Sequence, residues 1–150
     1  MAGFSDSAEL GIMNLVMCGK AWANFADNAA ASPTTAIWVA LHTADPTDSG
    51  TQASNEVALT AYTRIATSRS TGTGGWTLST AAGVISASPS AAITFPTLTS
   101  TSTGTATHAS IGLSSSGAGI LIASGALSAS IALGQNVAPQ ITTASSFTLD

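Results

Sequence analysis

The chain has 150 residues, of which only 7% are charged, against about 25% in an average soluble domain. Its three basic residues are too few to neutralise a run of phosphates or to dock on an anionic membrane, so we expect no direct binding to nucleic acid or membranes. A single cysteine, Cys18, excludes an intrachain disulfide and a thiolate zinc cluster. Cys18 lies among apolar residues, and we expect an inert, buried thiol.

The first predicted element is a helix over residues 6–26. Asp6 can cap its first backbone N–H groups while Glu9 reaches back, and both carboxylates suit the positive end of the helix dipole. Polar residues interrupt the apolar run and no basic stretch precedes it, so we expect neither a signal peptide nor a membrane span.

The apolar face of this helix is wide for a helix that lies on one small domain. Two interpretations stay open. Part of the helix docks on a neighbouring subunit, or the helix caps its own β-sandwich. The candidate contact residues on it are Leu10, Met13, Met17, Trp22 and Phe25.

From residue 35 onward the hydrophobic period changes to two, which is typical of strands. Residues 35–42 form the first predicted strand, and short segments between Gly, Ser and Pro turns form the others. These segments are 61–67, 75–79, 83–86, 91–96, 108–113, 119–127, 136–141 and 146–150. Pro96 and Pro139 cannot donate ladder hydrogen bonds, so we expect them at strand ends or on edge strands. The repetitive run 99–107 is expected to be a loop or an exposed strand.

This series of short strands predicts an all-β fold, a jelly-roll-like antiparallel β-sandwich with one N-terminal α-helix. Parallel β-α units would need helices between the strands, and no such helices are predicted. We expect two parts, the N-terminal helix with its linker over residues 1–34 and the β-sandwich domain over residues 35–150.

The segment WVALHTADPTDSG, residues 38–50, places His42, Asp45 and Asp48 after an apolar run. Asp45 and Glu56 fall at the first and last positions of a calcium loop, with Asp48 between them, which makes the three a weak calcium candidate. Hydroxyls occupy inner ligand positions and a strand precedes the loop, so we favour a turn, in which Asp side chains bond nearby N–H groups. Asp45 and Glu56 are also candidate subunit or capsid contacts.

No catalytic residue and no cofactor site is predicted. The serine-rich turn 114–117 lacks the strand and helix of a nucleophile elbow. His42 and His108 are expected to be hydrogen-bonded residues of strands. The one carboxylate pair available to a glycosidase is Glu56 with Asp45 or Asp48.

Seven short motifs follow one another between residues 37 and 150. They are WVALHTADPTDSGTQASNEV, YTR, GW, ITFPT, THASIGLSSSG, LIASGAL and FTLD. This order resembles a family of small virion proteins of tailed bacteriophages, often loosely labelled tail fibre proteins, some of which are capsid decoration or cement proteins. The resemblance implies a jelly-roll-like sandwich, usually trimeric, bound outside the major capsid shell, and it brings no catalytic residues. The N-terminal helix is not part of it, and this chain is richer in Ser and Thr and lower in charge.

The leading hypothesis is therefore a non-enzymatic capsid decoration protein, a homotrimer that binds the major capsid protein on the capsid exterior of the virion after assembly in the host cytoplasm. A low charge fits this role because interfaces favour apolar and aromatic residues over Lys and Glu. The alternative is a tail-tip or tail-fibre component that binds the host surface, including sugars through an exposed Trp76. A carbohydrate-active enzyme is a distant third hypothesis.

Overall fold

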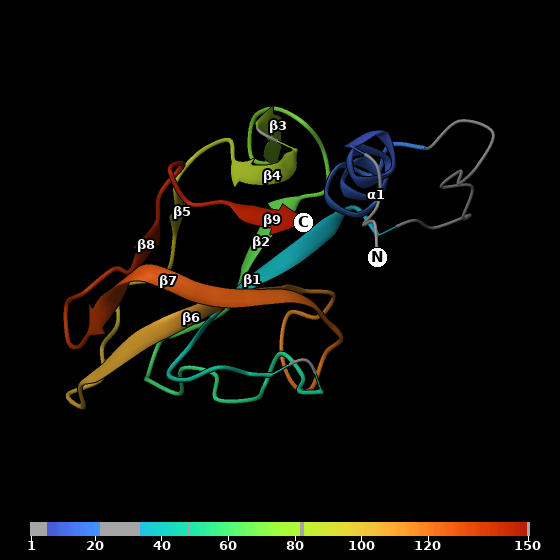
Figure 1. The fold of residues 1–150 in the computed structure, drawn as a ribbon. Coiled ribbons are helices and arrows are strands. Elements are labelled where there is room, and N and C mark those ends of the chain that lie inside the picture. Colours follow the sequence, from blue (N-terminus) through green and yellow to red (C-terminus); the bar gives the residue numbers. More distant parts are fainter. Residues whose placement is uncertain (1–5, 22–33, 48, 82, 150) are drawn as a thin grey trace. The chain divides into compact units, whose positions relative to one another are not determined.

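The computed structural model describes residues 6–21, 34–47, 49–81 and 83–149 (Figure 1). In this part of the chain one helix precedes a series of antiparallel strands. The elements are α1 (Asp6–Cys18), β1 (Ala36–His42), β2 (Ile65–Ser68), β3 (Trp76–Ala81), β4 (Val84–Pro89), β5 (Ile93–Thr94), β6 (Gly104–Gly112), β7 (Leu121–Leu133), β8 (Gln140–Ile141) and β9 (Phe147–Leu149). The predicted all-β class with one N-terminal helix is confirmed, and the arrangement is compatible with a β-sandwich.

The chain divides into two compact units. The first unit comprises Met1–Ala36, Thr67–Ala92 and Thr142–Asp150, and it holds α1 and the sheet β3-β4-β9. The second comprises Ile37–Ala66 and Ile93–Ile141, and it holds β1, β6, β7 and the β5–β8 pair. The strand order of the four-stranded sheet is β2-β1-β6-β7. These units cut across the boundary expected after residue 34, because α1 is grouped with β3, β4 and β9.

Helix α1 begins at the predicted residue but ends earlier than predicted. Gly19, directly after the helix, has a φ of 62°, a left-handed conformation that glycine adopts without steric cost and that ends helices. The N–H of Lys20 turns back to the carbonyl oxygen of Asn14, 3.0 Å away. The predicted end at residue 26 is therefore wrong. In the described part of the chain, no helix is long and apolar enough to cross a membrane.

One face of α1 packs within its own unit, against β3 and β4. Met13, Met17 and Cys18 are buried on this face, as expected for the thiol. Burial raises the pKa of the Cys18 thiol and keeps it protonated. The side chains of Asp6 and Glu9, like Trp22 and Phe25, lie outside the described residues. The buried methionines agree with the interpretation in which the helix caps its own domain.

The sheet beneath α1 has its own aromatic core. Trp76, at the start of β3, is fully buried and packs edge to face on Phe147 of β9, with ring centroids 5.9 Å apart. Ile85 and Ala87 of β4 are also fully buried. The hypothesis that an exposed Trp76 stacks on sugars is therefore wrong, since the indole is fully buried.

In the second unit, β1 is an inner strand that is buried on both faces at its end. Ile37, Val39 and Leu41 are fully buried, as the period-two pattern predicts. Ala40 and His42, on the opposite face, are fully buried too. A histidine in such a position must find hydrogen-bond partners inside the protein, because an unpaired buried polar group costs free energy.

The β6–β7 pair is longer than the hydrophobic pattern predicts. β6 begins at Gly104 and β7 continues to Leu133, whereas the predicted strands are 108–113 and 119–127. The added residues are mainly Ser, Thr, Ala and Gly, which carry little hydrophobic alternation. Cross-strand hydrogen bonding extends these strands where the pattern is weak. The repetitive run 99–107 is accordingly divided: residues 99–103 form a loop, and residues 104–107 are the first residues of β6.

Arg69 ties the end of α1 to the loop after β2. Its Nε donates to the carbonyl oxygen of Val16 at 2.8 Å, Nη2 donates to that of Leu15, and Nη1 donates to that of Thr34 at 3.2 Å. A cation beside the last carbonyls of a helix is favourable because these groups form the negative end of the dipole.

Replacing Arg69 by Met should loosen α1. The substitution leaves helix carbonyls without donors, and we expect the stability of the helix to fall by about 1–3 kcal/mol. Hydrogen exchange would show this as faster exchange over Asp6–Cys18. Lys20→Met, which removes the same charge from an exposed side chain just after the helix, is the control. Equal exchange in both variants would contradict the anchoring role.

Candidate functional site

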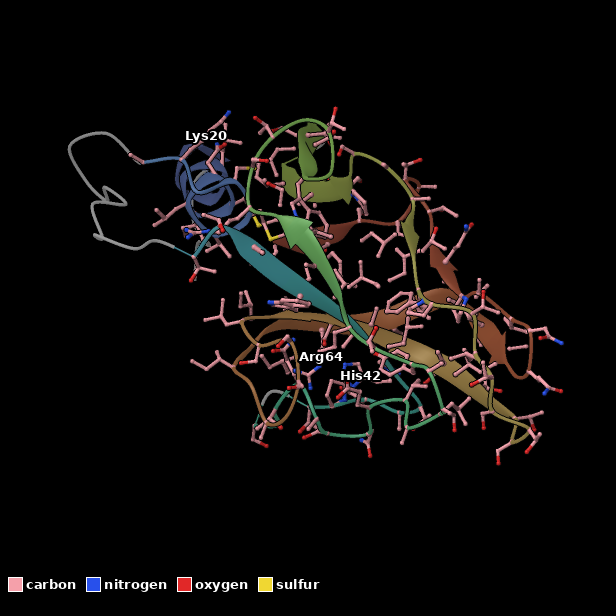
Figure 2. All side chains as sticks on the ribbon, turned by 180° about the vertical axis from the view of Figure 1, so that it is seen from behind. Lys20, His42 and Arg64 are labelled. Atoms are coloured by element: carbon pink, nitrogen blue, oxygen red, sulfur yellow. The ribbon has the colours of Figure 1, made fainter. Side chains whose placement is uncertain are left out.

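A group of buried and half-buried polar side chains lies in the second unit, where the chain after β1 folds back along it. We call His42, Gln52, Glu56, Arg64 and Ser110 the polar cluster. Figure 2 shows the side chains of His42 and Arg64 beside one another. His42, Gln52 and Ser110 are fully buried and Arg64 is 4% exposed. This is the most concentrated set of polar groups in the described core, and it is the candidate site.

His42 joins the loop to the sheet. Its Nδ1 lies 2.8 Å from the carbonyl oxygen of Ser54, and its Nε2 lies 2.7 Å from Oγ of Ser110 on β6. A carbonyl can only accept, so Nδ1 carries the hydrogen and Nε2 accepts from the Ser110 hydroxyl. Both ring nitrogens are therefore satisfied in the neutral ring.

Arg64 binds two loops at once. Its Nε and Nη2 donate to the two carboxylate oxygens of Glu56, each at 2.7 Å. Nη1 and Nη2 also donate to the carbonyl oxygens of Ser114 and Gly117, at 2.9 and 2.7 Å. The guanidinium suits this position because its rigid fork serves a carboxylate and carbonyls in one plane.

Gln52 makes three further bonds to the same region. Its Nε2 donates to the carbonyl of Trp38 at 3.3 Å, its Oε1 accepts from the N–H of Ser114 at 2.9 Å, and its backbone N–H donates to Gly119 at 3.1 Å. Gly112 and Gly119 leave the space that Gln52 fills, since a Cβ at either position would collide with it. The loop 113–120 is thus held by both Arg64 and Gln52.

Burial governs the ionisation of the groups in and around this site. It lowers the pKa of His42, opposed by the Ser54 carbonyl and the negative charge of Glu56. Burial also raises the pKa of Tyr62, whose hydroxyl accepts from the N–H of Leu41 at 2.8 Å. The ring of Tyr62 stacks on Phe95, with centroids 5.8 Å apart. At neutral pH the cluster therefore contains a neutral histidine beside one compensated ion pair.

The Ser110–His42 distance is within the reach that a nucleophile and its base need. The two groups are nevertheless fully buried, and the second nitrogen of His42 faces a backbone carbonyl where a catalytic triad has a carboxylate. We therefore interpret the pair as structural. Among the described residues, no group of three or more His, Cys, Asp or Glu side chains could hold a metal ion.

The two predicted loop carboxylates have separate partners. Oδ1 of Asp45 accepts from the N–H of Thr47 at 2.8 Å, the turn that the sequence favours. Asn55 donates to the Asp45 carbonyl, also at 2.8 Å. Both oxygens of Glu56 are bound by Arg64, while Asp48 lies outside the described residues. The described part of the calcium candidate is thus held by bonds within the protein.

The predicted contact residues on the helix lie at different depths. Met13 and Met17 are covered by their own unit, and Leu10 is 37% exposed. Sequence reasoning missed Gln52 and Ser110, for which the pattern offers no signal. The pairing of Arg64 with Glu56 could have been predicted from the sequence, because the chain has few charged residues and these two carry opposite charges.

Comparison with known families covers nearly the whole chain. Residues 3–147 match the family described as podophage GP4 fiber I protein gp80. The chain belongs to this family. The match includes the N-terminal helix, which the motif resemblance left out. No curated protein matches the sequence. The predicted phage virion family is thereby confirmed in its coarse form, a virion protein with a structural role.

Replacing Arg64 by Met should destabilise the protein strongly. Glu56 would lose its partner and two loop carbonyls would lose their donors. We expect a loss of about 3 kcal/mol, the lower end for breaking a buried ion pair, because Glu56 keeps some access to water. Chemical denaturation measures this loss. Lys20→Met, which removes an exposed cation, should change the midpoint little, and similar losses in the two variants would contradict the anchoring role.

Gly112 provides a second test of the same loop. An alanine there would meet the side chain of Gln52, which two hydrogen bonds hold in place, and overpacking of this kind costs about 1–3 kcal/mol. Gly125→Ala on β7 is the matched control, since its Cβ would meet nothing within 4 Å. Thermal unfolding of both variants should show a lower midpoint for Gly112→Ala alone.

Proposed function

We propose that the chain is a non-enzymatic structural component of a phage fibre. The observation that carries this proposal is the family match over residues 3–147, whose description names a podophage fiber protein. That description favours a place in the fibre. The motif resemblance, by contrast, favours the capsid exterior. Binding to the host surface is a further property of the fibre hypothesis and rests on that hypothesis alone.

The character of the fold supports a structural role. Residues 70–149 contain no Asp, Glu, Lys or Arg, so the second half of the chain can approach a neighbouring protein without desolvating charges. The polar cluster holds the loops of the second unit by charge-assisted and neutral hydrogen bonds. A framework of this kind presents a fixed surface, which suits a component that is assembled into a larger particle.

Capsid decoration is the second candidate, because the motif order resembles a family of small phage virion proteins, some of which are decoration proteins. In that role the chain would form a homotrimer and contact the major capsid protein on the shell. Particles that lack the chain would then be less resistant to heat and low salt. The fibre role predicts unchanged capsid stability and an altered fibre.

Electron microscopy of labelled particles distinguishes the two. Antibodies raised against the recombinant chain, carried on gold, should label the fibres of purified virions, with particles of a deletion phage as the control. Label over the capsid shell would overturn the fibre proposal and support decoration. If neither electron microscopy nor immunoblots detect the chain in purified virions, both the fibre proposal and the decoration proposal are overturned.

A further inference from the structure

His42 occupies a position in which the neutral form of its ring satisfies both ring nitrogens and the Ser110 hydroxyl hydrogen. In the neutral ring Nδ1 donates to the Ser54 carbonyl, so Nε2 accepts from the Ser110 hydroxyl. Ser110 is itself fully buried on β6. If Nε2 gains a proton, it becomes a donor to the Ser110 oxygen, and the Ser110 hydroxyl hydrogen loses the acceptor that the neutral ring provided.

The charges that face His42 offer little compensation for a second cation. Glu56 lies beside it through the isolated bridge between the two residues, but both of its oxygens are already bound by Arg64. Arg64 is itself positive and buried. His108 lies opposite His42 in the β1–β6 register, with its Nδ1 2.9 Å from Oγ1 of Thr107. Protonation would thus leave the cluster with an excess buried positive charge.

We propose that His42 makes the polar cluster an acid-sensitive latch, and that protonation of its ring releases the two segments held by the cluster, residues 51–57 and 113–120. This inference does not depend on whether the chain belongs to the fibre or the capsid. The latch is closed when the ring is neutral. It opens because the open form accepts the proton more readily than the closed one.

The released segment 113–120 carries two exposed aliphatic side chains. Ile120 is 66% exposed and Leu113 is 41% exposed, and the N–H of Leu113 donates to the carbonyl of Ile120 at 3.1 Å. In the closed state Arg64 and Gln52 hold this segment by hydrogen bonds to its backbone. Opening would allow Leu113 and Ile120 to change conformation, whereas the closed latch holds them in one conformation at neutral pH.

The direction of the pH dependence follows from burial. The pKa of His42 in the folded protein lies below its ordinary value of 6.5, so the closed form is most stable above that pH. It loses stability as the pH falls from 6.5 through the folded-state pKa. In this window opening should become about tenfold more frequent for each pH unit, because one proton is linked to it.

Hydrogen exchange of the full chain between about pH 8 and pH 5 tests the latch, in a range where most carboxylates stay ionised. After correction for the intrinsic pH dependence of exchange, peptides from 51–57 and 113–120 should lose protection below about pH 6.5. Peptides from β3 and β4 should not. Unchanged protection of the two segments across the range would overturn the proposal.

Two histidine variants identify the group responsible. His42→Gln should abolish the pH dependence of exchange in these segments, while His108→Gln should retain it. Loss of the dependence in His108→Gln alone would overturn the assignment. Because His42→Gln can also impair folding, a nuclear magnetic resonance titration of the wild-type ring provides an independent readout. A His42 pKa at or above 6.5 in that titration would contradict the latch.

Discussion

The ion pair between Arg64 and Glu56 is the interaction on which the second unit depends. A buried guanidinium is costly to desolvate, and it is tolerated here because four of its bonds end on a carboxylate and two loop carbonyls. Through these bonds a single side chain connects the segment after β1 with the loop between β6 and β7. Gln52 and His42 extend the same network without adding charge at neutral pH.

This concentration of polar contacts matters because the chain has so few charges. Most of the strands lie within residues 70–149, which contain neutral and mainly small side chains. These strands therefore form no ion pairs with one another. In the second unit, Gln52 and Arg64 from the first half of the chain hold the loop 113–120 by hydrogen bonds. Arg69 acts similarly in the first unit, where it binds the end of α1. In each unit, a single arginine makes several hydrogen bonds that hold neighbouring segments together.

Hydrophobic periodicity predicted much of the fold. The alternation in residues 35–42 identified β1, and glycine and proline turns separated the later strands correctly. The errors have physical causes. Helix α1 ends at Cys18 because Gly19 adopts a left-handed conformation, while the apolar composition continues beyond it. β7 extends past its predicted end because hydrogen bonding to β6 stabilises residues that carry little hydrophobic pattern.

By itself, the sequence determined the all-β class, the presence of one N-terminal helix and the phage virion family, because period, turn residues and ordered motifs are local properties. Its three basic residues and single cysteine also led us to expect no direct nucleic-acid binding and no thiolate zinc cluster. Only the tertiary structure decided which polar residues meet. His42 and Ser110 are 68 residues apart, and Arg64 is more than 50 residues from Gly117. Such pairs depend on strand order and on burial, which no local pattern encodes, and they turn the histidine of the LHTADP segment into part of a buried network.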